Sequence, residues 1–217
     1  MNTNQCLNGV DESYFINLSR RKDRLYNIQK NINFRINRFN AIDSKFLNDK
    51  KPLSKEEKAC FLSHYNLWLI AYQENKTILI LEDDVVFDLG FEDKWNCEYS
   101  NYLPSDYNII YLGGCLERNL PLYRKVLKKY NKYFFNVKKN NFFHKNDYFW
   151  HMTSIAYILT PSGAKVLINE YKHNDMNLPV DHFIIKSINK NDPNGLFHHV
   201  LMPAQSQNFT SDIKLHH

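Results

Sequence analysis

The chain has 217 residues, of which 43% are hydrophobic and 15% aromatic, so it can bury one sizeable core. Its formal net charge of +5 is mild, which suits phosphate-bearing ligands but does not require nucleic acid as a partner. The four cysteines are widely separated, which excludes the close pairs of zinc-binding and dithiol redox motifs, and we expect reduced thiols.

The ends of the chain bear on where the protein acts. The first dozen residues are polar and acidic, which is not the pattern of a secretory signal. No apolar run approaches the length that a membrane span needs. We therefore expect a cytoplasmic protein without a membrane span. Residues 214–217 resemble the beginning of an expression tag, which leaves a single domain over residues 1–213.

The first predicted unit is a strand, a basic turn and a helix. Residues 14–18 form a short apolar run, and apolar residues recur at helical spacing in residues 19–32, with Ser19 as the expected cap. Such a turn lies where open α/β sheets bind anions and other ligands, although a solvated basic surface is the alternative. The basic residues of this turn are Arg20, Arg21 and Arg24.

A second strand is predicted over residues 36–42, and a polar loop separates it from an amphipathic helix. Ser54 and Glu57 have the spacing of a capping box, so the helix begins there. His64 falls on the hydrophobic side of this helix, where a hydrogen-bonded core histidine is the usual role.

The next predicted strand ends in a cluster of acids. Four apolar residues at 78–81 are followed at once by Glu82, Asp83 and Asp84, as in a buried strand that leaves the core. Adjacent carboxylates repel one another at neutral pH unless a cation lies among them, and oxygen ligands favour Mg²⁺ or Mn²⁺. The stretch predicts a divalent-metal site that holds a phosphate-bearing substrate; a solvated acidic turn is the alternative.

Residues 88–107 are predicted to be irregular or a short helix, followed by a buried strand at 108–112 and a pair of glycines. The alternation of strands and helices indicates a doubly wound, largely parallel sheet. From 118 to 145, basic and aromatic residues interleave, as in a groove for single-stranded nucleic acid. Because no nucleic-acid-binding signature accompanies them, we favour a long substrate loop with short antiparallel strands.

The last third of the chain predicts two more strands and two helices. A strand at 155–159 precedes a helix that begins near Pro161, and Pro179 introduces a second helix with Asp181 in its first turn. The helix dipole keeps a carboxylate ionised there, so Asp181 could act as a base or orient a hydroxyl, or could simply be a helix-end residue. Residues 197–202 form the last candidate strand.

With these pieces in order, the chain resembles glycosyltransferase family 25, which contains bacterial lipooligosaccharide galactosyltransferases and domains that add galactose to collagen hydroxylysine. The resemblance covers nearly the whole chain and depends on six segments in the same order. These are FINLSRRKDRL (15–25), KACFLSHYNLW (58–68), LILEDDV (79–85), IIYLGG (109–114), AYILTPSGAKVLI (156–168) and LPVDHFI (178–184).

The resemblance implies a GT-A type α/β fold, in which helices flank a mostly parallel central sheet and an irregular region lies on the acceptor side. It implies a nucleotide-binding part at about 12–115 and an acceptor part at about 116–213. The implied reaction is a Mn²⁺-dependent (or Mg²⁺-dependent) inverting transfer of a hexose, galactose or glucose, from a UDP-sugar. The acceptor would be a hydroxyl of a glycan or of hydroxylysine, with no nucleic acid as partner; the oligomeric state stays open.

The same resemblance, together with the acid cluster, assigns candidate site residues. Asp84 would hold the metal with help from Glu82 or Asp83, and Asp181 is the candidate base, with Asp147 behind it. Residues expected around the nucleotide are Asn17, Arg20, Arg24, Ala41, Ser63, His64 and Asp83. Candidates for a third metal ligand are His198, His199 and Gln205.

Two other classes of function use the same features. A metal-dependent phosphohydrolase would need a nucleophilic Asp at the strand end, where this chain has Glu82. A non-enzymatic basic module would bind RNA or a polyanionic glycan through residues 118–145.

Overall fold

The structure is a computed structural model that describes most of the chain. The described residues are 5–48, 52–87, 89–112, 127–129, 131–137, 154–173, 176–191, 196–198 and 204–205. The predicted glycine pair, Asp147, His199 and residues 214–217 lie outside these ranges. None of the described helices is long and apolar enough to cross a membrane.

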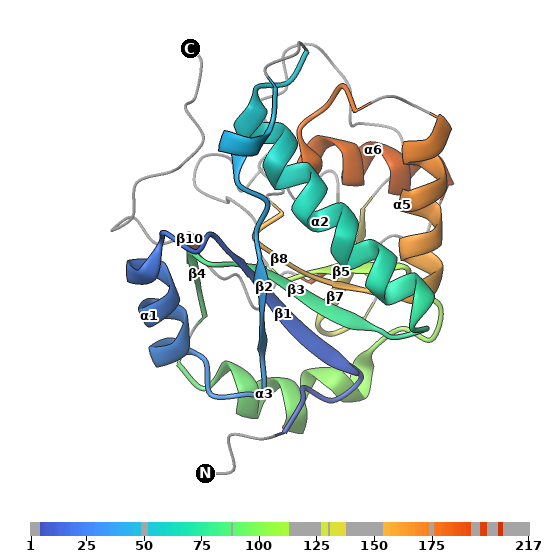
Figure 1. Cartoon of the computed structure of the whole chain (residues 1–217). Coiled ribbons are helices and arrows are strands. Elements are labelled where there is room, and N and C mark those ends of the chain that lie inside the picture. The colour runs from blue at the N-terminus through green and yellow to red at the C-terminus, as the bar shows by residue number, and fades with distance from the viewer. Residues whose placement is uncertain are drawn as a thin grey trace.

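A mixed sheet with the order β2-β1-β3-β8-β5-β9-β7-β6 forms the middle of the molecule (Figure 1). Six of the eight strands described in it run in one direction, whereas β7 and β8 run in the opposite direction. This arrangement confirms the predicted α/β class with a mostly parallel sheet. The strands are β1 (Glu12–Asn17), β2 (Asn37–Asn40), β3 (Ile78–Glu82), β5 (Ile109–Tyr111), β6 (Leu127–Lys129), β7 (Phe134–Val137), β8 (Ala156–Leu159) and β9 (Leu196–His198).

Helices cover both faces of the sheet, and each face has its own hydrophobic core. Alternate residues of a strand point to opposite faces, so Ile78 and Ile80 join the core under α2, α5 and α6, while Leu79 and Leu81 join the core under α1 and α3. Figure 1 shows the first group of helices on one side of the sheet and the second group on the other. The helices are α1 (Lys22–Asn31), α2 (Lys55–Gln73), α3 (Phe91–Cys97), α5 (Pro161–His173) and α6 (Val180–Asn191).

The local signals for helix starts have different outcomes. The capping box at α2 is confirmed, because the Ser54 hydroxyl accepts from the Glu57 amide at 3.2 Å and a Glu57 carboxylate oxygen accepts from the Ser54 amide at 2.8 Å. The prediction that Ser19 caps the first helix is wrong. The chain makes a turn in which the Arg21 amide donates to the Leu18 carbonyl, so α1 begins only at Lys22.

Two features of the topology are absent from the sequence prediction. Strand β8 lies antiparallel between β3 and β5, which places Tyr157 beside Ile80. A separate two-stranded ribbon pairs β4 (Val85–Val86) with β10 (Ala204–Gln205), which places the backbone of Gln205 opposite Val85. Both pairings bring late segments of the chain to the end of β3, where the acids lie.

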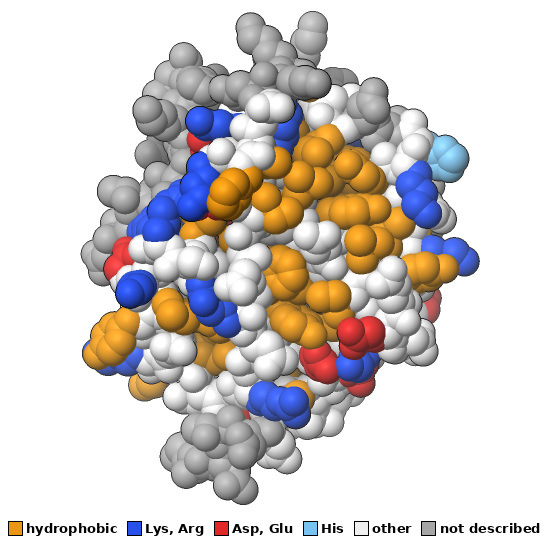
Figure 2. Space-filling model, viewed as in Figure 1, with side chains coloured by type: hydrophobic (Ala, Val, Ile, Leu, Met, Phe, Trp, Pro, Cys, Tyr) orange, Lys and Arg blue, Asp and Glu red, His pale blue; other side chains and the backbone are white. Residues whose placement is uncertain are grey.

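Hydrophobic side chains also reach the surface over α2 and α5 (Figure 2). Tyr65, Leu69 and Tyr171 are partly buried hydrophobic residues that pack against the core on this side, and Tyr72 is 46% exposed. Apolar atoms form a large share of any folded surface, so these exposed side chains do not by themselves indicate a binding site.

Candidate functional site

A pocket opens where β1 and β3 end, between the segment after β2 and the first half of α2. Its apolar wall comes from Ile16, Leu18, Ala41 and Ile42. Polar and charged side chains complete the lining, and those discussed below are Arg20, Arg24, Ser63, His64, Glu82 and the two aspartates that follow it. This is the edge at which open α/β sheets bind ligands.

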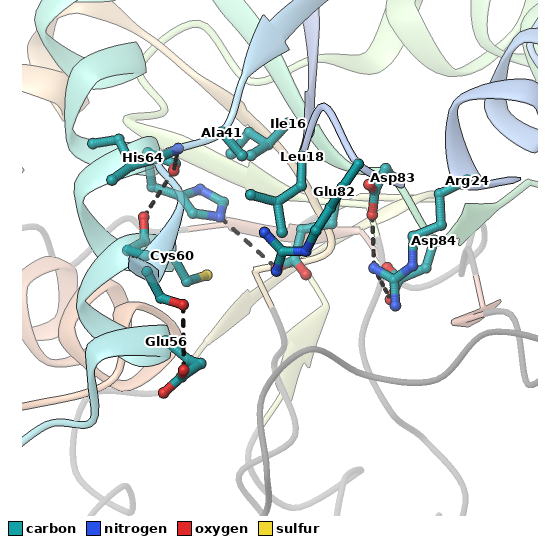
Figure 3. A pocket seen from close by; sticks show the side chains of 15 residues that line it. Ile16, Leu18, Arg24, Ala41, Glu56, Cys60, His64, Glu82, Asp83 and Asp84 are labelled. Carbon is teal, nitrogen blue, oxygen red and sulfur yellow. Dashed lines mark hydrogen bonds and ion pairs between the residues drawn. The ribbon is translucent and has the colours of Figure 1, made fainter. Parts of the chain in front are cut away.

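One side of the pocket is an ion-pair cluster built on Arg24. The same guanidinium nitrogen lies 2.7 Å from Asp83 Oδ1 and 3.3 Å from Asp84 Oδ2, and all three side chains are less than 10% exposed (Figure 3). Asn17 donates to the other Asp83 oxygen at 2.6 Å, and Arg38 donates to the Asn17 oxygen at 2.9 Å. Both Asp83 oxygens therefore have partners from the first strand–helix unit.

On the other side of the pocket, the neighbours of Glu82 are the hydroxyl of Ser154 and the imidazole of His64. Ser154, which precedes β8, donates to Glu82 Oε1 at 2.5 Å, and His64 Nε2 lies 3.8 Å from the same oxygen. The other ring nitrogen of His64 contacts the Tyr157 hydroxyl at 2.8 Å. In Figure 3, His64 and Glu82 point toward one another, while Asp83 and Asp84 lie on the side of Arg24.

The carboxyl groups near the pocket have shifted pKa values. Burial raises the pKa of Glu82, but the interactions with the His64 ring and with the hydroxyl of Ser154 outweigh it, so the pKa lies below its usual value. Burial raises the pKa of Asp83 despite its hydrogen bonds with Arg24 and Asn17. Burial also raises the pKa of Asp181, and the charge of Glu82 adds to that shift. Asp181 is therefore within the field of Glu82, although it does not line the pocket.

Hydrogen bonds of the backbone amides after β2 hold the apolar wall in place. The Ile42 amide donates to Ser63 Oγ at 2.9 Å, and this hydroxyl donates to the Ala59 carbonyl at 2.7 Å. The Ala41 amide donates to the Asn17 carbonyl at 3.0 Å. Ser63 thus shapes the pocket by fixing the segment after β2 to helix α2.

The structure brings most of the predicted nucleotide-site residues together. Seven of the candidate residues line the pocket together with Asp84: they are Arg20, Arg24, Ala41, Ser63, His64, Glu82 and Asp83. Asn17 lies behind Asp83 rather than in the lining. Asp147 and His199 are outside the described residues, and His198 and Gln205 are described by their backbone only, in β9 and β10.

His64 is a fully buried, hydrogen-bonded core residue and also lines the pocket, so its predicted place at the nucleotide stays a prediction. Several residues in or beside the pocket were not predicted, among them Cys60, Ser154 and Tyr157. Cys60 lies on the same face of α2 one turn earlier, and the FLSH segment could have indicated it. Ser154 and Tyr157 come from a distant strand, and no local pattern points to them.

Two sets of side chains near the pocket offer metal ligands. The carboxylates of Glu82 and Asp84 both line it, and their oxygen atoms suit hard divalent ions such as Mg²⁺ and Mn²⁺. Ligand atoms of Cys60, His64 and Glu82 also lie within 4.8 Å of one another, a combination that suits softer ions such as Zn²⁺. The expected reduced state of the thiols is confirmed for Cys6, Cys60 and Cys97, which are free.

Comparison with known proteins assigns the family. The family model described as glycosyltransferase family 25 (LPS biosynthesis protein) matches residues 10–184, which include the pocket and helix α2. The chain belongs to glycosyltransferase family 25. Its sheet and flanking helices are consistent with the GT-A-like fold that the sequence implies.

Individual relatives of this family member are similar over most of the chain. It is 28% identical to human procollagen galactosyltransferase 2 over 207 residues, covering 84% of the chain and 31% of the human protein. It is 28% identical to a glycosyltransferase 25 family member of Anopheles gambiae, covering 79% of the chain and 30% of that protein. It is 27% identical to the procollagen lysyl hydroxylase and glycosyltransferase of Acanthamoeba polyphaga mimivirus, covering 81% and 21%. The chain thus spans about a third or less of the length of these curated relatives.

Proposed function

We propose that this chain is a metal-dependent inverting glycosyltransferase that moves a hexose, galactose or glucose, from a UDP-sugar to a hydroxyl group. The observation that carries the proposal is one pocket, at the ends of β1 and β3, that combines an apolar wall, two arginines and strand-end carboxylates. A nucleoside diphosphate needs each of these features. Its flat base packs on an apolar wall and its anionic phosphates pair with arginines, while the carboxylates would hold the divalent ion that offsets the phosphate charge.

The donor would lie with its base against the apolar wall and its phosphates near the arginines. Ala41 and Ile42 give that wall, which Ser63 fixes to α2. Arg20 is the more available of the two arginines, since its side chain is 47% exposed and pairs with Asp43 at the surface. Arg24 is buried against the aspartates and sets the charge of the pocket floor.

Asp84 and Glu82 are the residues that would hold the divalent ion, because their carboxylates line the same pocket. An ion held there, Mn²⁺ or Mg²⁺, would supply positive charge to stabilise the departing diphosphate. A third ligand could come from the C-terminal segment, and the pairing of β10 with β4 favours Gln205, whose backbone lies opposite Val85.

Asp181 is the residue that we propose as the base. In a single displacement the acceptor oxygen attacks the anomeric carbon from the face opposite the leaving diphosphate, and a carboxylate near that oxygen takes its proton. A raised pKa suits this role, because a carboxylate with a higher pKa is a stronger proton acceptor. The runner-up is Asp147.

The acceptor would be a hydroxyl of a glycan or of hydroxylysine. One relative is a procollagen galactosyltransferase and the family is described as LPS biosynthesis protein, which favours these two classes. We assign acceptor binding to about residues 116–213 and donor binding to about 12–115. Strand β8 of the proposed acceptor part pairs with β3 of the proposed donor part, so the two parts share one sheet and are not separate domains.

The two other classes of function predict different outcomes in one experiment. The chain is incubated with a panel of nucleotide sugars with and without Mn²⁺, and binding is measured by calorimetry. A transferase binds uridine diphosphate sugars only with the metal, a phosphohydrolase releases phosphate, and a basic module for RNA or polyanionic glycans does neither.

Asp84→Ala tests the carboxylate that the proposal needs most. We expect this substitution to abolish metal-dependent binding of the donor, because it removes a ligand for the ion. Asp23→Asn is the matched control, since its carboxylate is on α1 at the surface and pairs with Arg21. Donor binding by the Asp84 variant at the wild-type affinity would overturn the assignment.

A further inference from the structure

A chain of hydrogen bonds runs through the core and ends at the pocket. Trp68 Nε1 donates to the Tyr157 hydroxyl oxygen at 2.9 Å, and the same hydroxyl lies 2.8 Å from His64 Nδ1. All three side chains are fully buried. His64 and Trp68 are one turn apart on α2, whereas Tyr157 comes from β8.

The direction of these bonds follows from counting protons. An indole N–H is only a donor, so the Tyr157 oxygen must accept from Trp68. The phenol has one proton of its own to donate, and among the described residues His64 Nδ1 is its hydrogen-bond partner. If Nδ1 carried a proton, the Tyr157 proton would be left in the core without an acceptor, which buried polar groups avoid. Nδ1 therefore accepts, and the neutral ring carries its proton on Nε2.

That proton faces the pocket. Within the described part of the chain, His64 Nε2 has no hydrogen-bond partner, and Glu82 Oε1 lies 3.8 Å away. This separation is an ion–dipole contact rather than a full hydrogen bond. Ser154 donates to the same oxygen at 2.5 Å. Both groups thus act on Oε1, which leaves Glu82 Oε2 for a ligand in the pocket.

We propose that Trp68 and Tyr157 lock His64 in the Nε2–H tautomer, and that His64 is a positioning residue that orients Glu82 from the core. The consequence for transfer rests on the proposed function, in which Glu82 helps to hold the metal. The locked tautomer also means that His64 presents a proton rather than a lone pair to Cys60 and Glu82. The Cys60–His64–Glu82 cluster is then not a site for a soft metal ion.

The direct test is the nitrogen spectrum of the full chain labelled with ¹⁵N-histidine. The chain has nine histidines, and the signals that disappear in His64→Asn identify His64. We expect the shifts of a protonated Nε2 and an unprotonated Nδ1 at neutral pH, and Tyr157→Phe should give a mixture of tautomers. A protonated Nδ1 in the wild-type chain would overturn the proposal, and this result needs neither donor nor activity.

A cobalt titration tests the competing account of the same cluster. If Co²⁺ produced a thiolate-to-cobalt charge-transfer band that is lost in Cys60→Ser, and Zn²⁺ shifted the His64 nitrogen signals, both side chains would be acting as ligands and the proposal would fall. We expect no such band, and no change in the His64 signals when Zn²⁺ is added.

A pair of substitutions then tests the positioning role. The amide of His64→Gln reaches the place of Nε2 and can still donate to Glu82, whereas that of His64→Asn reaches only the place of Nδ1. We expect His64→Asn to lower kcat about 10- to 100-fold, as loss of a partner behind a metal ligand does, and His64→Gln to restore most of it. Equal loss in both variants would contradict the role. An inactive wild-type chain with the expected tautomer would instead contradict the proposed function alone.

Discussion

On one side of the pocket, Asp83 and Asp84 share the guanidinium of Arg24, whereas on the other side Glu82 lies among Ser154, His64 and Cys60. The first arrangement places a permanent positive charge between two carboxylates. The second supplies hydroxyl and imidazole donors, which are uncharged dipoles rather than permanent ions. The three acids are consecutive in the sequence, yet their surroundings differ completely.

The difference lies in how far the charge of each acid is compensated within the protein. Arg24 lies near both aspartates, at distances of 2.7 and 3.3 Å. Glu82 has no such partner among the described residues within ion-pair distance other than His64, and its charge also raises the pKa of Asp181. We infer that Arg24 fixes the positions of Asp83 and of the proposed metal ligand Asp84, whereas the charge of Glu82 is the least compensated of the three.

The largest effect on transfer is expected at Asp181, whose pKa is raised by burial and by the charge of Glu82. Asp181→Asn should lower transfer by about 10²- to 10⁴-fold while donor binding persists, because it removes the proton acceptor but no donor contact. A base works only when it is deprotonated. Since burial raises the pKa of Asp181, the wild-type rate should begin to fall, as pH is lowered, at a higher pH than for an ordinary aspartate.

The measurement is the dependence of kcat/KM on pH for the wild type and for Asp23→Asn, which should share the same acid limb. Wild-type turnover in Asp181→Asn would remove Asp181 from the mechanism. An acid limb at the pH of an unperturbed aspartate would contradict both the burial of Asp181 and the effect of Glu82 on it.

The Arg24 side should respond mainly in stability. Arg24→Ala leaves two buried carboxylates without their shared cation, and breaking a buried ion pair costs about 3–5 kcal/mol of the free energy of unfolding. Arg20→Ala is the matched control, because Arg20 also lines the pocket but is 47% exposed, and its loss should cost at most about 1 kcal/mol.

Urea denaturation at neutral pH measures both changes. Similar losses in the two variants would mean that Arg24 is no more structural than Arg20, and the contrast between the two sides of the pocket would disappear.

The contrast between the two sides also marks how far the sequence alone could reach. The acid triplet, the arginines after β1 and the capping box of α2 are local signals, and the structure places all of them as predicted. When a helix begins a few residues after a strand ends, as α1 does after β1, the two ends are close in space regardless of how the rest of the chain folds. Arg24 and His64, which the sequence suggested for the nucleotide site, accordingly both lie in the pocket lining, and their role in binding stays a prediction.

The partners of Glu82 could not be predicted in the same way. Ser154 reaches Glu82, and Tyr157 reaches His64, only because β8 runs antiparallel beside β3. Strand order and direction are set by long-range pairing rather than by hydrophobic periodicity. The β4–β10 ribbon has two residues in each strand, which is too short for any pattern. The error at Ser19 has a local cause, since a turn at Leu18–Arg21 delays the helix.

A smaller loss of stability is expected from the core behind Glu82. Tyr157→Phe removes the hydroxyl that serves both Trp68 and His64, and leaving buried polar groups unpaired costs about 1–3 kcal/mol. Tyr26→Phe is the control, since Tyr26 is 69% exposed and should change little. Urea denaturation gives both values. A Tyr157 variant as stable as the wild type would mean that water or a rotated ring replaces the lost contacts.

The smallest effect is expected from an ion pair far from the pocket, which sets the scale for the Arg24 cluster. The pKa of Glu12 is lowered because Lys76 and Tyr14 donate hydrogen bonds to it, which outweighs burial. Since its folded pKa is below the unfolded one, this contact stabilises the fold at neutral pH, and the benefit is lost as pH falls through the folded pKa. Glu12→Gln should therefore lower the urea midpoint slightly at neutral pH, and the difference should vanish in acid and shrink in high salt.

The buried Arg24 cluster should keep most of its effect in the same salt, because buried pairs are screened much less. If salt weakened both alike, the aspartates of the pocket would be solvated like Glu12, and Arg24 would not be the clamp that separates them from Glu82.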